Sequence, residues 1–349
     1  MIQWKTSRIP PVWLRSGSLA IFLLFGYLLF SHHQIQNIPQ PELPLKTSNS
    51  CIGYEYAPSI VVSVKTGATE ALEKIPTLMR TTLQCIPNTL LFSDLSQDLR
   101  EYHLYDALDT VSPSTVSTNP DFKFYIQQQE LWESKRNVSS LRGVRNPENP
   151  SDLAAWRLDK YKFLHLLEKT WRMKPDMDWY FVIDADTYVL WPNMLNWLST
   201  LEPDKRSYFG SEVSIGGVRF AHGGSGIILS KAAMYELANN GTAGKWDKKT
   251  FDKCCGDLVL SMALGEHGTT LQDIWPSMSG ETPFTMPFGP GTPEYWCKPA
   301  LTMHHLTPGD MVELAKFESR REEKSVSFRL QEISSLAKSS PLLATIDAC

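Results

Sequence analysis

A short apolar run that ends in two acidic residues places the strongest constraint on the fold of this chain. Residues 179–183 read Trp-Tyr-Phe-Val-Ile, and Asp184-Ala185-Asp186 follows directly. Such a run predicts a buried β-strand, and in open α/β sheets ligands bind outside the carboxyl ends of the strands. Residues two apart on an extended chain point to the same side, so Asp184 and Asp186 can converge on one cation. The alternative is that one of them only caps the following turn.

The chain around this strand alternates predicted strands and helices. Residues 59–64 and 88–92 predict two strands, and residues 71–84, interrupted by Pro76, predict a helix between them. This order is the unit of a parallel sheet covered by helices, so we expect an α/β fold. Residues 112–150 predict a long excursion around a helix near residues 122–134. Residues 156–171 predict one amphipathic helix, with an apolar face made of Trp156, Phe163, Leu164, Leu167 and Trp171.

The first 50 residues predict a membrane anchor and a stem. Lys5, Arg8 and Arg15 precede an uncharged apolar run at residues 16–31. Positive charge on the N-terminal side keeps that end in the cytosol. We therefore expect a cytosolic tail (1–15), a transmembrane signal-anchor (16–31), a stem (32–50) and a lumenal domain (51–349). The short run favours the thin membranes of the Golgi or endoplasmic reticulum. A cleaved signal peptide is disfavoured because no small-x-small cleavage pattern lies nearby.

Cysteine and charge content fit a lumenal domain. In an oxidising compartment the cysteines are expected to form disulfides, with a pairing that their spacing does not fix. Zinc is disfavoured because no pair has C-x-x-C spacing. The net charge of -4 provides no general polycation for nucleic acid. Sequons at Asn137 and Asn240 also fit a lumenal chain. The six cysteines are Cys51, Cys85, Cys254, Cys255, Cys297 and Cys349.

Three further motifs place polar or glycine residues beside predicted elements. The loop Gly223-Gly224-Ser225-Gly226 leads through an apolar run into a helix predicted near Ser230. It either presents backbone N–H groups to a sugar or is a plain tight turn. Asp257 opens a helix predicted at residues 258–264, as a general base or as a helix cap. One of His304 and His305 could complete an Asp/Asp site for Mn²⁺ or Mg²⁺.

The order of these motifs is similar to that of one enzyme family. Over residues 59–308 the chain resembles the fringe-like and core 1 β-1,3-galactosyltransferase-like glycosyltransferases of family 31, especially their fungal-type members. The segments that carry the resemblance are Lys65-Thr66-Gly67, Leu91-Phe92-Ser93-Asp94, residues 156–164, Ile183 to Thr187, the Gly223 loop, Gly256-Asp257 and His304-His305.

The resemblance implies a GT-A fold, that is, a Rossmann-like mixed sheet flanked by helices. It also implies metal-dependent, inverting transfer of a hexose from a UDP-sugar to a glycan or glycoprotein acceptor. The first expectation for the sugar and linkage is galactose in β-1,3 linkage. The chain departs from many animal relatives at two positions, since Ala185 and Gly256 stand where those relatives carry acidic residues. The identity of the donor and acceptor therefore does not carry over directly from those relatives.

The same resemblance implies roles for single residues. Asp257 corresponds to the catalytic base. Nucleotide-sugar contacts correspond to Thr66, Gly67, Asp94, Asp184, Gly223 and Gly224. The metal, Mn²⁺ or Mg²⁺, corresponds to a site made by Asp184, Asp186 and one of His304 and His305.

Two other functions use the same residues differently. A catalytically inactive lumenal relative would act as a folding partner or a glycan-binding protein, although such a protein has no need of both carboxylates. A metal-dependent phosphohydrolase would use the same Asp pair, but the sequence lacks the additional Asp/His clusters that two-metal sites require.

Overall fold

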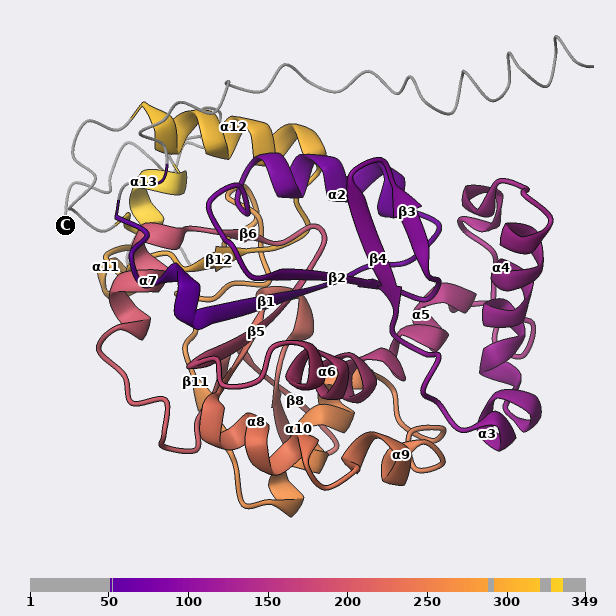
Figure 1. The fold of residues 1–349 in the computed structure, drawn as a ribbon. Coiled ribbons are helices and arrows are strands. Elements are labelled where there is room, and N and C mark those ends of the chain that lie inside the picture. Colours follow the sequence, from indigo (N-terminus) through magenta and orange to yellow (C-terminus); the bar gives the residue numbers. More distant parts are fainter. Residues whose placement is uncertain (1–50, 52, 288–291, 321–327, 335–349) are drawn as a thin grey trace, which may run out of the picture. The chain divides into compact units, whose positions relative to one another are not determined.

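A mixed sheet forms the centre of the computed structural model, which describes residues 51, 53–287, 292–320 and 328–334 (Figure 1). Within the described residues its strands lie in the order β11-β7-β10-β5-β1-β2-β4-β3. All run parallel except β10 and β3, which are antiparallel to their neighbours. The bounds are β1 Ile60–Lys65, β2 Thr89–Ser93, β3 Gln97–Leu99, β4 Tyr102–Asp106, β5 Trp179–Asp184, β7 Tyr208–Gly210, β10 Ile227–Ser230 and β11 Leu271–Asp273.

Two pairs of strands stand apart from this sheet. β6 (Tyr188–Val189) pairs with β12 (Thr302–Met303), and β8 (Glu212–Ile215) pairs with β9 (Val218–Ala221). Because β6 begins two residues after Asp186, its pairing with β12 brings a distant segment of the chain beside the predicted metal motif.

Helices cover both faces of the sheet (Figure 1). Alternate residues of β1 and β5 point to opposite faces, so Val62 and Phe181 join one buried cluster while Val61 and Tyr180 join another. The first cluster includes α2 (Ala71–Arg80), α7 (Trp191–Leu198) and α12 (Pro308–Ser319). The second includes α6 (Lys162–Met173), α8 (Lys231–Ala238) and α10 (Gly256–Glu266). The predicted α/β fold, as a mixed α/β structure around a large sheet, is confirmed.

Most of the locally predicted elements form. The predicted strands become β1, β2 and β5, and the helix expected near residues 122–134 is α4 (Lys123–Glu133). Ser230 is the N-cap of α8, as its position predicted. The remaining helices are α3 Pro113–Thr118, α5 Ala154–Asp159, α9 Thr242–Trp246, α11 Pro293–Trp296 and α13 Leu330–Ser334.

The single helix predicted at residues 156–171 is wrong. The chain forms α5 and α6 instead, with a break at Lys160 and Tyr161. Lys160 is buried, and its Nζ donates to the carbonyl of Phe251 at 2.8 Å and pairs with Asp121 at 2.9 Å. The break aims this ammonium group inward. Trp156 is 49% exposed and does not belong to an inward apolar face.

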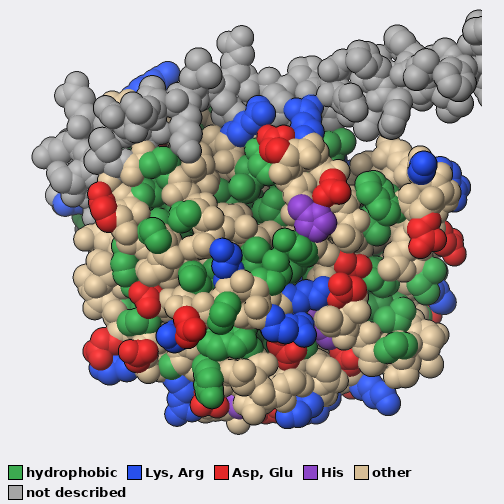
Figure 2. Space-filling view, in the orientation of Figure 1, with side chains coloured by type: hydrophobic (Ala, Val, Ile, Leu, Met, Phe, Trp, Pro, Cys, Tyr) green, Lys and Arg blue, Asp and Glu red, His purple; other side chains and the backbone are tan. Residues whose placement is uncertain are grey.

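Disulfides form as predicted, between Cys51 and Cys85 and between the neighbours Cys254 and Cys255. Cys297 is also disulfide-bonded. The predicted tail, anchor and stem at residues 1–50 lie outside the described residues. Within the described part of the chain, no helix has the length and apolarity needed to cross a bilayer. On the face shown in Figure 2, acidic and basic side chains are interspersed among apolar ones.

Asn193 of α7 provides a test of how the C-terminal segment is attached. Its buried amide donates to the carbonyls of Ala300 and Phe328, each at 2.7 Å, and accepts from the Phe328 N–H at 2.9 Å. We expect Asn193→Ala to lower the free energy of unfolding by about 3 kcal/mol, because it leaves buried backbone groups without partners. Denaturant unfolding measures the change. The control is Asn196→Ala, an exposed position on the same helix, and an equal loss there would contradict this assignment.

Candidate active site

The carboxyl ends of neighbouring parallel strands carry the charged residues that the sequence singled out. Lys65 ends β1 and Asp184 ends β5, and the two residues lie opposite each other in the β1–β5 register. Asp94 directly follows β2, the neighbour of β1 on its other side. The side chains therefore gather at one edge of the sheet, where open α/β sheets bind their ligands.

Asp184, Asp186 and His304 converge at this edge. His304 Nε2 lies 3.1 Å from Asp186 Oδ1 and 3.8 Å from Asp184 Oδ2. The β6–β12 pairing places His304 there, and the Leu306 N–H donates to the Asp186 carbonyl at 3.1 Å. His305 lies beside them, with its ring centroid 3.9 Å from that of His304. Asp186, His304 and His305 each offer a ligand atom, all within 4.8 Å of one another.

Both carboxylates are paired with lysines. Lys65 Nζ lies 2.9 Å from Asp184 Oδ1, and Lys74 Nζ lies 3.2 Å from Asp186 Oδ2. Burial alone would raise the pKa of Asp186, but the hydrogen bond and charge of His304 and the charge of Lys74 outweigh it and hold this pKa below its usual range. Asp186 is therefore ionised at neutral pH, as a metal ligand must be.

The donor set fits a divalent cation. Carboxylate oxygens with an imidazole nitrogen suit Mn²⁺, and carboxylates alone suit Mg²⁺. Five carboxylates surround three ammonium groups, so two negative charges would be left for a divalent ion that His304 binds as a neutral imidazole. The buried Nδ1 of His304 has no hydrogen-bond partner among the described residues. Among the described residues, the ionic cluster consists of Glu70, Asp94, Asp159, Asp184, Asp186, Lys65, Lys74 and Lys162.

The glycine loop forms the 3₁₀ turn η4 (Gly223–Ser225), which lies against the histidine. A Cβ atom on Gly224 would lie 2.1 Å from Cε1 of His304, so only glycine lets the ring pack there. The Gly224 carbonyl accepts from Thr187 Oγ1 at 2.8 Å, and the Ser225 carbonyl accepts from Thr302 Oγ1 at 2.6 Å. The segments that carry Asp186 and His304 therefore both hold this turn.

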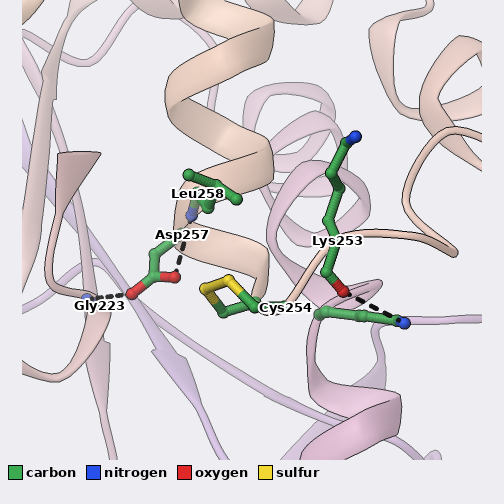
Figure 3. The surroundings of a disulfide bond; sticks show 7 residues. Gly223, Lys253, Cys254, Asp257 and Leu258 are labelled. Atoms are coloured by element: carbon green, nitrogen blue, oxygen red, sulfur yellow. Dashed lines mark hydrogen bonds between the residues drawn. A yellow bond between two sulfur atoms is a disulfide. The ribbon is translucent and has the colours of Figure 1, made fainter. Parts of the chain in front are cut away.

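Asp257 is hydrogen-bonded to the same turn (Figure 3). It stands in the first turn of α10, directly after the Cys254–Cys255 disulfide. Its Oδ1 accepts from the Leu258 N–H and its Oδ2 from the Gly223 N–H, each at 2.9 Å. Burial raises the pKa of Asp257, while these donors and Lys65 oppose the rise. Asp257 is thus more than a cap of its own helix, because it also binds the glycine turn.

The predicted nucleotide contacts lie at the ends of β1 and β2. Thr66 is buried, and its Oγ1 has no hydrogen-bond partner among the described residues. Gly67 is partly buried and leads into α2. Asp94 is fully buried; its Oδ1 accepts from the Ala68 N–H at 2.6 Å and its Oδ2 from Gln128 Nε2 at 2.9 Å. These bonds hold the loop after β1, and a ribose contact by Asp94 stays a prediction.

Sequence reasoning gave no role to four residues that shape the site. They are Lys65 and Lys74, Asp159, which pairs with Lys65 at 2.7 Å, and His222, whose ring centroid lies 5.6 Å from that of His304. The position of Lys65 at the end of an otherwise apolar strand could have indicated a buried lysine with an acidic partner. The helical spacing of Glu70 and Lys74 predicts only a surface ion pair, so nothing local pointed to Asp186.

The chain is similar to a curated human enzyme and to a solved structure. Human chondroitin sulfate glucuronyltransferase is 24% identical over 155 residues, which is 43% of this chain, and the chain spans only 18% of the length of that enzyme. Among solved structures, a glycosyltransferase involved in the glycosylation of the major capsid of PBCV-1 aligns over 73% of this chain and 99% of its own, with 12% identity and a TM-score of 0.31.

The family model described as Fringe-like matches residues 56–266. This range is more than half of the chain and includes β1, Asp184, Asp186, the glycine turn and Asp257. The histidines at positions 304 and 305 lie beyond it. The chain therefore belongs to the fringe-like family of glycosyltransferases, family 31.

Proposed function

We propose that this chain is a metal-dependent, inverting glycosyltransferase with a GT-A fold. It would move a hexose, with galactose the first expectation, from a UDP-sugar to a glycan or glycoprotein acceptor in β-1,3 linkage. One observation carries the proposal. The turn at Gly223 and Gly224 has His304, the partner of Asp186, packed against Gly224 and the Asp257 carboxylate bonded to Gly223. A sugar lying over this turn would have a metal site at one end and a base at the other.

The donor side of the site would be held by the carboxylate and imidazole groups. Asp184, Asp186 and one of His304 and His305 would bind Mn²⁺ or Mg²⁺, which neutralises a diphosphate and stabilises the charge that develops as it leaves. The chain itself keeps these ligands ready. Lys65 and Lys74 pair with the two carboxylates, and the low pKa of Asp186 keeps it deprotonated.

The acceptor side would depend on Asp257. Each carboxylate oxygen has two acceptor positions, so the N–H donors of Gly223 and Leu258 leave room for an acceptor hydroxyl. Burial raises the pKa of Asp257, which makes it a stronger base than an exposed aspartate. Attack from the side of the sugar opposite the leaving diphosphate would invert the anomeric centre.

The same proposal includes a Golgi or endoplasmic reticulum location, with residues 16–31 as a type II anchor. The apolar run with its N-terminal positive charge and the Cys51–Cys85 disulfide support a lumenal domain. The human relative is a glucuronyltransferase by name, so a UDP-hexuronate is the second donor to test after UDP-galactose.

Asp186→Asn tests the metal site. Because Asn loses the negative charge that draws a cation, we expect Mn²⁺-dependent UDP release to fall by about a thousandfold. A coupled assay of UDP release over a panel of UDP-sugars measures it. The control is Asp204→Asn, an exposed aspartate, which should retain the rate. UDP release by Asp186→Asn at the unaltered rate would remove the metal assignment.

Asp257→Asn tests the base. We expect transfer to fall by about a hundredfold or more while UDP binding, measured by calorimetry, stays within about twofold of that of the unaltered enzyme. In the unaltered enzyme, transfer should decline as pH falls through the raised pKa of Asp257, because the protonated acid cannot take a proton. This acid limb should therefore lie above the range of an ordinary aspartate.

The matched control for Asp257 is Asp252→Asn, an exposed residue just before the disulfide. It should leave both transfer and UDP binding unchanged. If Asp257→Asn abolished UDP binding as well as transfer, Asp257 would act by holding the glycine turn, and its role as base would be wrong.

Gly224→Ala tests the packing of the glycine turn against the metal site. Its Cβ would overlap the His304 ring, so the ring must shift. We expect the Mn²⁺ concentration for half-maximal activity to rise by about tenfold or more, as for other disturbed metal ligands. Gly244→Ala, where a Cβ meets nothing within 4 Å, is the control. An unchanged Mn²⁺ requirement in Gly224→Ala would show that His304 is not a ligand.

A further inference from the structure

The two lysines at the metal site differ in how firmly they are held. Lys65 lies on β1 with a side chain only 7% exposed, and its ammonium group is 4.9 Å from the centre of the Phe163 ring. Asp159 holds the same ammonium at 2.7 Å. Lys65 is thus enclosed by protein on several sides. It can hardly leave Asp184 without unpacking the edge of the sheet.

Lys74 is less enclosed than Lys65. Its side chain is 19% exposed, and its second partner is Glu70, one helical turn earlier in α2 at 2.9 Å. An i,i+4 pair at a helix surface contributes little to holding a side chain. The lysine side chain has four rotatable bonds. Lys74 can therefore exchange the Asp186 carboxylate for another anion without disturbing the fold.

The position of Lys74 suggests which anion that is. The loop of Thr66 and Gly67, predicted to contact the nucleoside, leads directly into α2, and the N-terminus of this helix faces the same edge of the sheet. Lys74 lies in the first turn of this helix and reaches Asp186. A diphosphate joins the nucleoside to the sugar, so in a donor bound between loop and metal it would pass beside Lys74. Helix N-termini also favour phosphate groups.

Charge gives the reason for an exchange. A divalent cation at Asp186 would meet the ammonium of Lys74 on the same carboxylate, and like charges this close repel strongly in a partly buried site. A diphosphate alone would meet two excess negative charges at this edge. Each of the two ligands therefore lowers the electrostatic cost of the other, provided that a positive group can follow the diphosphate.

We propose that Lys74 is the counter-charge of Asp186 in the empty site and passes to the donor diphosphate when metal and donor bind. The inference rests on the proposed function and adds to it a donor-binding residue that couples the two ligands. Removing the ammonium would then have opposite effects on them. Affinity for the metal alone would rise. The increase in metal affinity that a bound nucleoside diphosphate causes would become smaller.

The experiment measures Mn²⁺ binding to the lumenal domain with and without UDP, by the paramagnetic resonance signal of free Mn²⁺. For Lys74→Met we expect affinity for Mn²⁺ alone to rise about fivefold, and the gain in Mn²⁺ affinity caused by UDP to shrink about tenfold. Lys74→Arg, which keeps the charge, should restore most of this gain. Lys316→Met, which breaks an exposed helical pair with Glu313, is the matched control and should behave as the unaltered protein. Thermal unfolding without metal checks that each variant is folded.

Three results would overturn the proposal. Unchanged affinity of Lys74→Met for Mn²⁺ alone would show that Lys74 does not compete with the metal. A raised Mn²⁺ affinity with the full UDP-induced gain would show that Lys74 does not reach the diphosphate. If the unaltered protein bound no Mn²⁺ even with UDP, the proposed function would fail first and this inference with it.

Discussion

The pairing of β1 with β5 in a single register is the constraint on which the site depends. It sets Lys65 opposite Asp184 at the edge of a sheet whose strands are otherwise apolar. A carboxylate at such a half-buried position is stable only with a partner of opposite charge, and Lys65 supplies it. Asp159 in turn balances Lys65, so one ion-pair chain joins β5, β1 and α5. Asp186, two residues further along the chain, pairs with Lys74 instead and lies beside the same His304 as Asp184.

The glycine turn is the second constraint, because both His304 and Asp257 contact it. A side chain at Gly224 would displace His304, and one at Gly223 would meet Phe163 at 2.8 Å. With no side chains between them, the imidazole and the Asp257 carboxylate approach the same short segment of backbone. Thr187 and Thr302 hold that segment from the strands that carry the acidic pair and the histidine. The backbone of this turn, and not a side chain, therefore separates the His304 ring from the Asp257 carboxylate.

Local patterns predicted what is determined locally. The run at residues 179–183 predicted β5, the position of Ser230 predicted the start of α8, and Asp257 was expected in the first turn of a helix. The break between α5 and α6 could not be predicted, because the apolar period continues through it and only the distant partners of Lys160 explain the break. The contact between His304 and Asp186 depends on the pairing of β6 with β12, which are more than a hundred residues apart. Strands of two residues leave almost no signal in the sequence, so this contact could not be predicted.

The charge at this edge would make the binding of the two proposed ligands interdependent. Three lysines offset part of the charge of five carboxylates, and two negative charges remain in excess. In the proposed site, the excess negative charge would attract a divalent cation and would oppose a phosphate that arrives without one. A bound cation would remove this repulsion. The edge would therefore favour a donor diphosphate that binds together with its cation over the diphosphate alone, before any specific contact to the sugar is made.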